Sequence, residues 1–211
     1  MKNYAFEIPI ISQQSVLPCL LLNRPFSFLD IGCSKPSESC CHALFNLEGF
    51  TEIGKHLHFV DINHFEGWDG LNFHQIDATK TNWDFVESAE FVQIDVEGLG
   101  KRFEVLTTIP LERLDTKIIS IEHDGYRTKK HNKDYDSAER NPQREYLKAK
   151  GYKLLYKDVT NNLGDDYEDW WVREDLWEQS KHLYSENMVD NKIHKKLNTL
   201  WHEGTYQHWG N

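Results

Sequence analysis

Five acidic residues that each follow an apolar run are the first feature of the sequence able to carry chemistry. Each closes a segment typical of a buried strand, and they are Asp30, Asp61, Asp77, Asp95 and Glu122. In an open α/β sheet, ligands bind beyond the carboxyl ends of the strands. A single acid there is more often a turn or capping residue than a ligand. Five at one edge would repel one another, so the pattern favours a cationic ligand or a metal ion among them.

The turn after Asp30 narrows the choice of ligand. Gly32 lacks a side chain, which allows a cofactor to approach the backbone closely. A dinucleotide also needs a Gly-rich turn for its pyrophosphate, but the segment GCSKPS (32–37) lacks the second and third glycines. S-adenosylmethionine carries a positive sulfonium and no phosphate. An acidic, glycine-poor edge therefore favours S-adenosylmethionine over a dinucleotide.

These residues need an alternating series of strands and helices to hold them. Apolar residues have helical spacing at 101–115 and at 144–150, and Gly151 closes the second segment. Ser37 is a candidate N-cap for a helix through residues 40–45. The apolar runs predict strands at 26–31, 56–62, 72–77, 91–96, 117–123, 152–159 and 170–173.

The expected fold is therefore α/β: a mostly parallel, seven-stranded sheet with flanking helices, in which the last two strands form an antiparallel hairpin at one edge. A length of 211 residues supports a single domain, 1–211. We expect its core at about 24–175. Residues 176–211 are expected to form a C-terminal helical extension, which could cover a substrate cleft or form a homodimer.

Charge and composition exclude several classes of protein. The chain has 24 basic and 34 acidic residues, and an acidic chain of this kind argues against general nucleic-acid binding. No apolar run is long enough to span a bilayer, so no membrane span is expected. Four cysteines without a CxxC spacing fit reduced thiols. The sequence thus predicts a cytoplasmic location.

Several stretches of the chain together resemble one known family. In chain order they are FLDIGCS (28–34), HFVDIN (58–63), FHQIDAT (73–79), FVQIDVEG (91–98), FEVL (103–106), IISIEHD (118–124), REYLKAKGYKLLYKD (144–158) and DWWV (169–172). They resemble the FkbM-type family of S-adenosylmethionine-dependent methyltransferases. The resemblance implies a Rossmann-like class I methyltransferase fold and methylation of a hydroxyl group on a sugar, a glycan or another small molecule.

The resemblance also implies roles for individual residues toward S-adenosylmethionine. Asp30, Gly32 and Ser34 resemble the loop for its amino acid end. Asp61, followed by Ile62, resembles the ribose-binding acid, Asp77 with Ala78 the adenine contact, and Asp95 the acid beside the departing methyl group. Two departures stand out: Ser34 and Pro36 replace the family's Asn and Gly, and the segment 99–102 follows DVEG as an apparent two-residue insertion.

An alcohol needs a general base to become a nucleophile at neutral pH. His123 and Asp95 are the main candidates, with Glu97 close to Asp95 in sequence. Alternatively, Asp95, Glu122 and His123 could hold Mg²⁺ or Mn²⁺, which would lower the pKa of the hydroxyl. We favour the metal-free base.

The acceptor side is less sharply marked in the sequence. Tyr126 and Arg127 begin a basic cluster that could hold an anionic acceptor, although a solvated loop fits equally well. Trp171 could be a platform for a sugar ring, with core packing as the alternative. The sequence predicts an O-methyltransferase of a sugar or glycan. Its alternatives are methylation of another small molecule or of a nucleic-acid hydroxyl, and a non-catalytic binding module.

Overall fold

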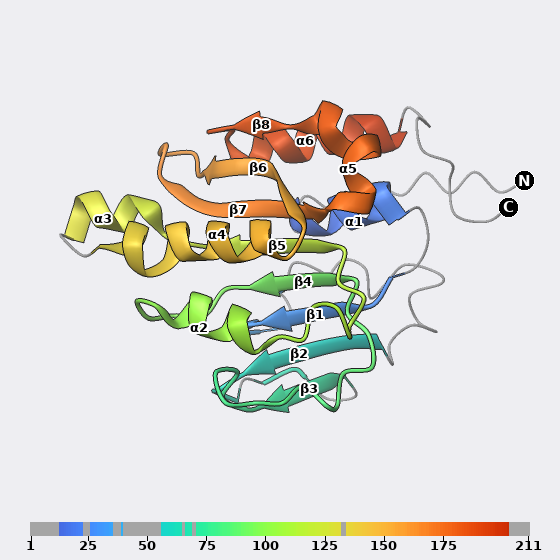
Figure 1. Ribbon diagram of the computed structural model, residues 1–211, viewed down its shortest axis with the longest axis vertical. Helices are drawn as coiled ribbons and strands as arrows, with labels where there is room; N and C mark the ends of the chain where they lie inside the picture. Colours follow the sequence, from blue (N-terminus) through green and yellow to red (C-terminus); the bar gives the residue numbers. More distant parts are fainter. Residues whose placement is uncertain are drawn as a thin grey trace, which may run out of the picture.

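Eight strands form one sheet in the order β3-β2-β1-β4-β5-β7-β6-β8 (Figure 1). The computed structural model describes residues 13–22, 26–35, 39, 56–64, 66–68, 71–131 and 134–202. Five strands pair in parallel. They are β1 (Phe28–Ile31), β2 (Leu57–Asp61), β3 (Asn72–Gln75), β4 (Phe91–Ile94) and β5 (Ile118–Glu122). Their parallel pairing brings the carboxyl ends of these strands to one edge of the sheet.

The other half of the sheet differs from the prediction in one respect. Strand β7 (Asp166–Arg173) lies antiparallel between β5 and β6 (Tyr152–Thr160), which confirms the hairpin. The short strand β8 (Ser185–Glu186) then pairs with β6, so the sheet has eight strands and the hairpin is not its outermost element. All seven predicted strands are present. The eighth is two residues long and has no alternation that a sequence pattern could detect.

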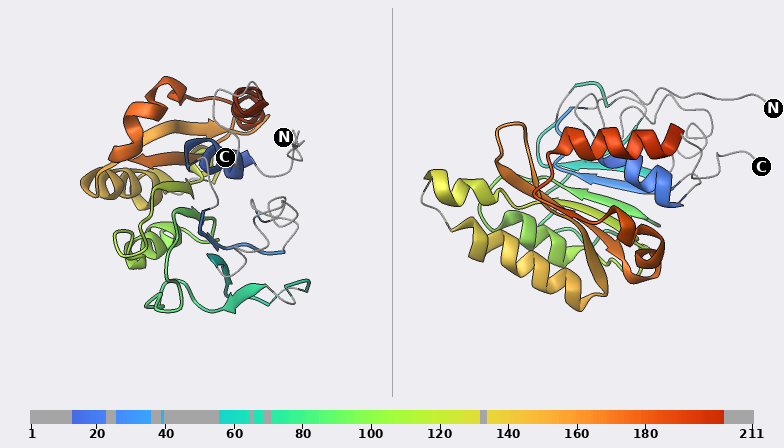
Figure 2. Two further views of the ribbon diagram at one scale, coloured as in Figure 1. Left: turned by 90° about the vertical axis from the view of Figure 1, so that its right-hand side faces the viewer. Right: turned by 90° about the horizontal axis from the view of Figure 1, so that it is seen from above.

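Helices cover both faces of the sheet (Figure 2). On one face lie α1 (Gln13–Leu22) and α6 (Asp190–His202), which contact each other. On the other lie α2 (Lys101–Thr108) and α4 (Asn141–Ala149), the latter preceded by the π-helical turn η4 (Asp136–Arg140). The remaining helices are α3 (Gly125–His131), α5 (Glu174–Ser180) and the short 3₁₀ turn η5 (Lys181–Leu183). None of the helices in the described ranges has both the length and the apolar character needed to cross a bilayer.

Two apolar layers hold the helices on the sheet. Phe28 and Phe59 belong to the layer beneath α1 and α6, whereas their neighbours Leu29 and Val60 belong to the opposite layer. Adjacent residues of a strand point to opposite faces, and helices cover both, which explains why the central strands β1, β4 and β5 are mostly apolar. Because both faces of these strands are buried, their residues form the continuous apolar runs from which the sequence predicts strands.

The predicted helices differ from the observed ones mainly at their ends. The segment 101–115 is helical only to Thr108, because Pro110 disfavours the helical conformation at Ile109, which is extended. Gly151 has φ +84° and ends α4 as expected. The sequence did not predict α1, which contains Pro18. The helix expected through residues 40–45 lies outside the described residues.

Candidate functional site

The turn after β1 is pressed between the ends of β2 and β4. Gly32 donates its backbone N–H to Val60 O at 2.8 Å, and the N–H of Asp95 donates to Ile31 O at 2.9 Å. Gly32 has φ +88°, and a Cβ on it would lie 1.8 Å from the carbonyl oxygen of Asp95. Only glycine fits this position. The close approach places the predicted acids of β1, β2 and β4 at one edge.

Asp30 is the buried member of this group. Its carboxylate accepts a hydrogen bond from the Ser39 hydroxyl. Burial raises the pKa of Asp30 to about 7; the Ser39 bond opposes that rise, and the negative charges of Asp95 and Asp61 add to it. Asp95 and Asp61 therefore both lie close enough to Asp30 to repel its negative charge.

Asp61 shapes the loops on either side of it. Its Oδ1 accepts the N–H of Asn63 at 2.7 Å, and its Oδ2 accepts the N–H of Ser34 at 3.4 Å. Ile62, the next residue, is 63% exposed, which is unusual for a large apolar side chain. The Trp68 indole donates to the carbonyl of Ser34 at 3.0 Å and fixes the turn from the other side. Asp61 and Ile62 thus present a carboxylate and an apolar side chain beside the β1 turn.

Asp77 is held within its own turn. It accepts from the N–H and hydroxyl of Thr79 at 3.1 and 2.7 Å and pairs with Lys80 at 2.7 Å. The hydrogen bonds from Lys80 and Thr79 lower its pKa to about 2. Ala78 is buried. These contacts match the capping role that is common for an acid after a strand.

Asp95 and Glu122 meet at the ends of β4 and β5 around a buried arginine. Both carboxyl groups face the same guanidinium nitrogen. Nη2 of Arg102, which is fully buried, lies 3.1 Å from Glu122 Oε2, 2.9 Å from Asp124 Oδ2 and 3.8 Å from Asp95 Oδ1. Burial raises the pKa of both Asp95 and Glu122, and each shift includes a contribution from the other carboxyl group. The pair therefore retains a proton more readily than two isolated acids.

Arg102 reaches this position because of how α2 begins. The N–H groups of Arg102 and Phe103 donate to the carboxylate of Glu139, at 3.4 and 3.0 Å. A carboxylate is favoured at a helix N-terminus, where free N–H groups and the helix dipole are both positive. Glu139 thus anchors the first turn of α2 from η4. Nε and Nη1 of Arg102 have no hydrogen-bond partner among the described residues, so its side-chain hydrogen bonds all go to Glu122 and Asp124.

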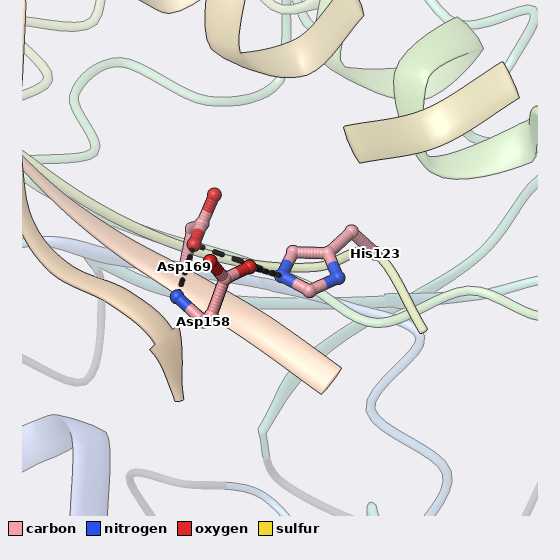
Figure 3. A group of neighbouring side chains, drawn as sticks. All are labelled: His123, Asp158 and Asp169. Carbon is pink, nitrogen blue, oxygen red and sulfur yellow. Dashed lines mark hydrogen bonds and ion pairs between the residues drawn. The ribbon is translucent and has the colours of Figure 1, made fainter. Parts of the chain in front are cut away.

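His123 does not join Asp95 and Glu122, which corrects both of its predicted roles. Its side chain is fully buried. Nδ1 accepts the N–H of Gly125 at 3.0 Å, and Nε2 faces Asp169 Oδ1 at 3.6 Å and Asp158 Oδ1 at 3.7 Å (Figure 3). A histidine that is enclosed in this way cannot reach an acceptor as a general base. The predicted metal set of Asp95, Glu122 and His123 is not assembled.

His123, Asp158 and Asp169 bring three potential ligand atoms within 4.8 Å of one another. Both carboxylates are already paired with cations, however. Arg144 contacts Asp158 at 2.6 Å and Asp169 at 2.7 Å, and Arg140 contacts Asp158 at 2.9 Å. Burial raises the pKa of Asp169, but its interactions with His123 and Arg144 outweigh the effect of burial and leave the pKa low. Two guanidinium groups would repel a metal cation. We therefore interpret this cluster as a buried ion-pair network that holds the loop after β5 in place.

Three of the remaining predicted residues lie beside that loop. Arg127 contacts Asp124 at 3.0 Å and Glu97 at 3.3 Å, and its Nε lies 3.1 Å from the Tyr126 hydroxyl. The Glu97 side chain is 80% exposed. Tyr126, Arg127 and Glu97 are thus brought together next to Asp124. The exposed contact to Glu97 is the one that an incoming anion could most easily replace.

Trp171 does not fit a role in binding the acceptor. Its ring is fully buried among the apolar residues on one side of the sheet, and Trp170 is buried on the other side. Helices cover both faces, so neither ring is free to stack on a sugar. Core packing, the alternative considered for Trp171, is what the structure shows.

Sequence reasoning missed Arg102 and Asp124 as partners of the acidic pair. Arg102 lies in the segment 99–102 that departs from the family pattern, and a basic residue directly after DVEG was the available signal. The network of Arg140, Arg144 and Asp158 had no comparable signal, because it depends on the contact of α4 with β6. The chain matches no protein-family model, and no curated protein matches it.

Proposed function

We propose that the chain is an S-adenosylmethionine-dependent O-methyltransferase that acts on a hydroxyl group of a sugar or glycan. The observation that carries the proposal is the convergence of Asp30, Asp61 and Asp95 around Gly32. The mostly parallel sheet with an antiparallel β6–β7 hairpin is compatible with a Rossmann-like fold of the class I methyltransferase type. It agrees with the FkbM-type resemblance of the sequence.

The residues at this edge fit S-adenosylmethionine on chemical grounds. Asp61 uses one acceptor position on each oxygen for backbone N–H groups, and a carboxylate has about four such positions, so it can also accept from two ribose hydroxyls. The exposed side chain of Ile62 offers an apolar contact for an adenine ring. Asp30 and Asp95 repel each other, and a positive ligand would relieve that repulsion.

S-adenosylmethionine, when bound, supplies a methyl group on a positively charged sulfur. The protein must then hold the acceptor hydroxyl in line and take its proton. Among the predicted bases, Asp95 is 41% exposed at the side chain, whereas His123 is fully buried. Asp95 is therefore the base that an acceptor can reach. The third residue of the predicted metal set, His123, faces Asp158 and Asp169 instead, so we propose the reaction without a metal.

Tyr126 and Arg127 are proposed to contact the acceptor. They lie beside Asp124, which shares Arg102 with Glu122 and Asp95. Arg127 can exchange its exposed contact with Glu97 for a carboxylate or phosphate on the acceptor. An anionic sugar, such as a nucleotide-sugar or a phosphorylated glycan, fits this arrangement.

The proposal is tested in two steps that separate cofactor from acceptor. S-adenosylhomocysteine should raise the thermal unfolding midpoint of the purified protein, because a ligand that binds the folded state stabilises it. Transfer of a labelled methyl group should then be detected with at least one member of a panel of neutral and anionic glycans. Stabilisation without transfer to any hydroxyl would indicate a binding module. The absence of stabilisation would contradict the proposed function itself.

A further inference from the structure

Asp95 and Glu122 form a carboxyl pair that opens toward solvent on one side only. The Asp95 side chain is 41% exposed and the Glu122 side chain 22%, while Arg102 behind them is fully buried. Nη2 of Arg102 lies 3.1 Å from Glu122 Oε2 and 3.8 Å from Asp95 Oδ1, so the two carboxyl groups share one cation, and like charges that close favour a proton on one of them. Asp95 is the more exposed of the two, so an acceptor reaches the pair from its side.

Several acidic groups surround Asp95 and Glu122, whereas a single cation among the residues that the structure describes contacts them. Arg102 reaches the pair from α2, while Glu168 faces Glu122 across the β5–β7 pairing. The charged or titratable groups that face the pair are Asp30, Glu97, Arg102, Asp124 and Glu168, and Arg127 pairs with two of these acids. This excess of acids favours the state in which the pair holds one proton.

The pair lies at the edge where the proposed cofactor binds. The backbone of Asp95 is packed against Gly32, and Asp95 is close enough to Asp30 to raise its pKa. A positive charge placed at this edge would favour the doubly ionised pair, and removal of that charge would favour the return of a proton. A methyl transfer both removes the positive charge from the sulfur and releases a proton from the acceptor.

We propose that Asp95 and Glu122 share one proton in the free protein and release it when the positively charged S-adenosylmethionine binds. During methyl transfer the pair takes up the proton that the acceptor hydroxyl loses. This inference rests on the proposed function. In the transfer step the O–H bond of the acceptor breaks and its proton goes to Asp95. The oxygen forms a bond to the methyl carbon, and the electron pair of the carbon–sulfur bond stays on sulfur. Glu122 acts as a positioning residue that returns the pair to its singly protonated state, and Arg102 holds Glu122 in place.

The test compares S-adenosylmethionine with S-adenosylhomocysteine, which differ in the methyl group and the sulfur charge. Calorimetric titrations of the full chain near pH 7, in buffers with different ionisation enthalpies, give the number of protons released by each ligand. S-adenosylmethionine should release up to about one proton more than S-adenosylhomocysteine, so its affinity should rise up to about tenfold more per pH unit below the pKa of the pair. Equal proton counts for two well-bound ligands would overturn the inference and leave the proposed function intact. If neither ligand binds, the proposed function fails.

Variants assign the proton to its source. Glu122→Gln keeps the shape and the hydrogen-bond donor but cannot titrate, so the difference between the two ligands should disappear. Asp95→Asn should do the same and serves if Glu122→Gln does not fold. Asp30→Asn is the control, because Asp30 also has a raised pKa at this edge. It should change the proton count for both ligands alike. Loss of the difference in Asp30→Asn, but not in Glu122→Gln, would assign the proton to Asp30 and contradict the inference.

Discussion

Arg102 and Asp124 form a buried ion pair, Nη2 to Oδ2 at 2.9 Å, directly behind the carboxyl groups of Asp95 and Glu122. Removing the guanidinium would leave Glu122 without its counter-charge and Asp124 with only that of Arg127. Arg102→Met should therefore lower the free energy of unfolding by about 3–5 kcal/mol. Denaturant unfolding measures this loss. Lys101→Met is the matched control, since the Lys101–Glu104 pair is exposed and contributes at most about 0.5 kcal/mol. Equal effects of the two variants would contradict a structural role for the buried arginine.

The contact between Gly32 and Asp95 makes a second prediction. Gly32→Ala places a Cβ 1.8 Å from backbone, which the chain can relieve only by moving the ends of β1 or β4. Gly100→Ala is the control, because Gly100 also has a positive φ, +81°, but a Cβ on it meets nothing within 4 Å. It should cost about 1–2 kcal/mol from backbone strain alone. Thermal and denaturant unfolding should show a clearly larger loss for Gly32→Ala, and similar losses would argue against the close approach.

The hydrogen-bonded imidazoles of His58 and His74, Nδ1 to Nε2 at 3.1 Å, make stability depend on pH. Burial, followed by the charge on His74, lowers the pKa of His58 to about 4 from an ordinary value of 6.5. Between these pH values the unfolded chain binds more protons than the folded one. The contribution of His58 to the free energy of unfolding should therefore fall as the pH drops from 6.5 toward 4, by up to about 3 kcal/mol, and level off below, whereas the raised pKa of Asp30 adds stability over the same range.

Denaturation at pH 7 and pH 5 tests this dependence with two variants. His58→Asn removes the titrating ring, so acidification from pH 7 to pH 5 should destabilise this variant less than it destabilises the wild-type protein, or stabilise it more. His182→Asn, at an exposed position, should change with pH as the wild-type protein does. The same change with pH in His58→Asn as in the wild-type protein would contradict a neutral His58 in the folded state.

The network of His123, Asp158 and Asp169 leads to a prediction about metals. Because Arg140 and Arg144 already neutralise the two carboxylates, millimolar Mg²⁺ or Mn²⁺ should not raise the unfolding midpoint, and EDTA should not lower it. A metal ion present at a hundred times the dissociation constant of its site would raise the free energy of unfolding by about 2.7 kcal/mol. A metal-dependent rise that is lost in Asp169→Asn would show that the cluster binds a cation after all.

The strands could be predicted because both faces of the sheet are covered. Runs such as Phe91–Ile94, which Asp95 follows, and Ile118–Glu122 are mostly apolar, and each forms a strand whose carboxyl end lies at the same edge. The strand Ser185–Glu186 is too short to have a pattern. Helix α1 was not predicted; it contains Pro18, a residue that disfavours a helix interior, although the apolar residues of the helix are buried in the core.

The acidic residues of the candidate site could be predicted from the sequence, but the side chains that contact them could not. An alternating series of strands and helices places the carboxyl ends of parallel strands at one edge, and the observed order, with β1 between β2 and β4, brings Asp61 and Asp95 close to Asp30. The direction of the His123 side chain does not follow. His123 comes directly after Glu122, yet neighbouring residues point to opposite sides, and His123 meets Asp169 only because β7 pairs antiparallel with β5. Contacts of this kind depend on the tertiary fold.

The central claim, an S-adenosylmethionine site built around Asp61, is tested most directly by calorimetric titration of S-adenosylhomocysteine into the wild-type protein and Asp61→Ala. Asp84→Ala, on an exposed loop, is the matched control, and Asp61→Asn keeps an acceptor for the backbone N–H groups that Asp61 now binds. Loss of charge-assisted hydrogen bonds to the ribose should weaken binding about a hundredfold or more in Asp61→Ala, with no change in the control. Unchanged affinity in Asp61→Ala, or no binding by the wild-type protein, would contradict the claim.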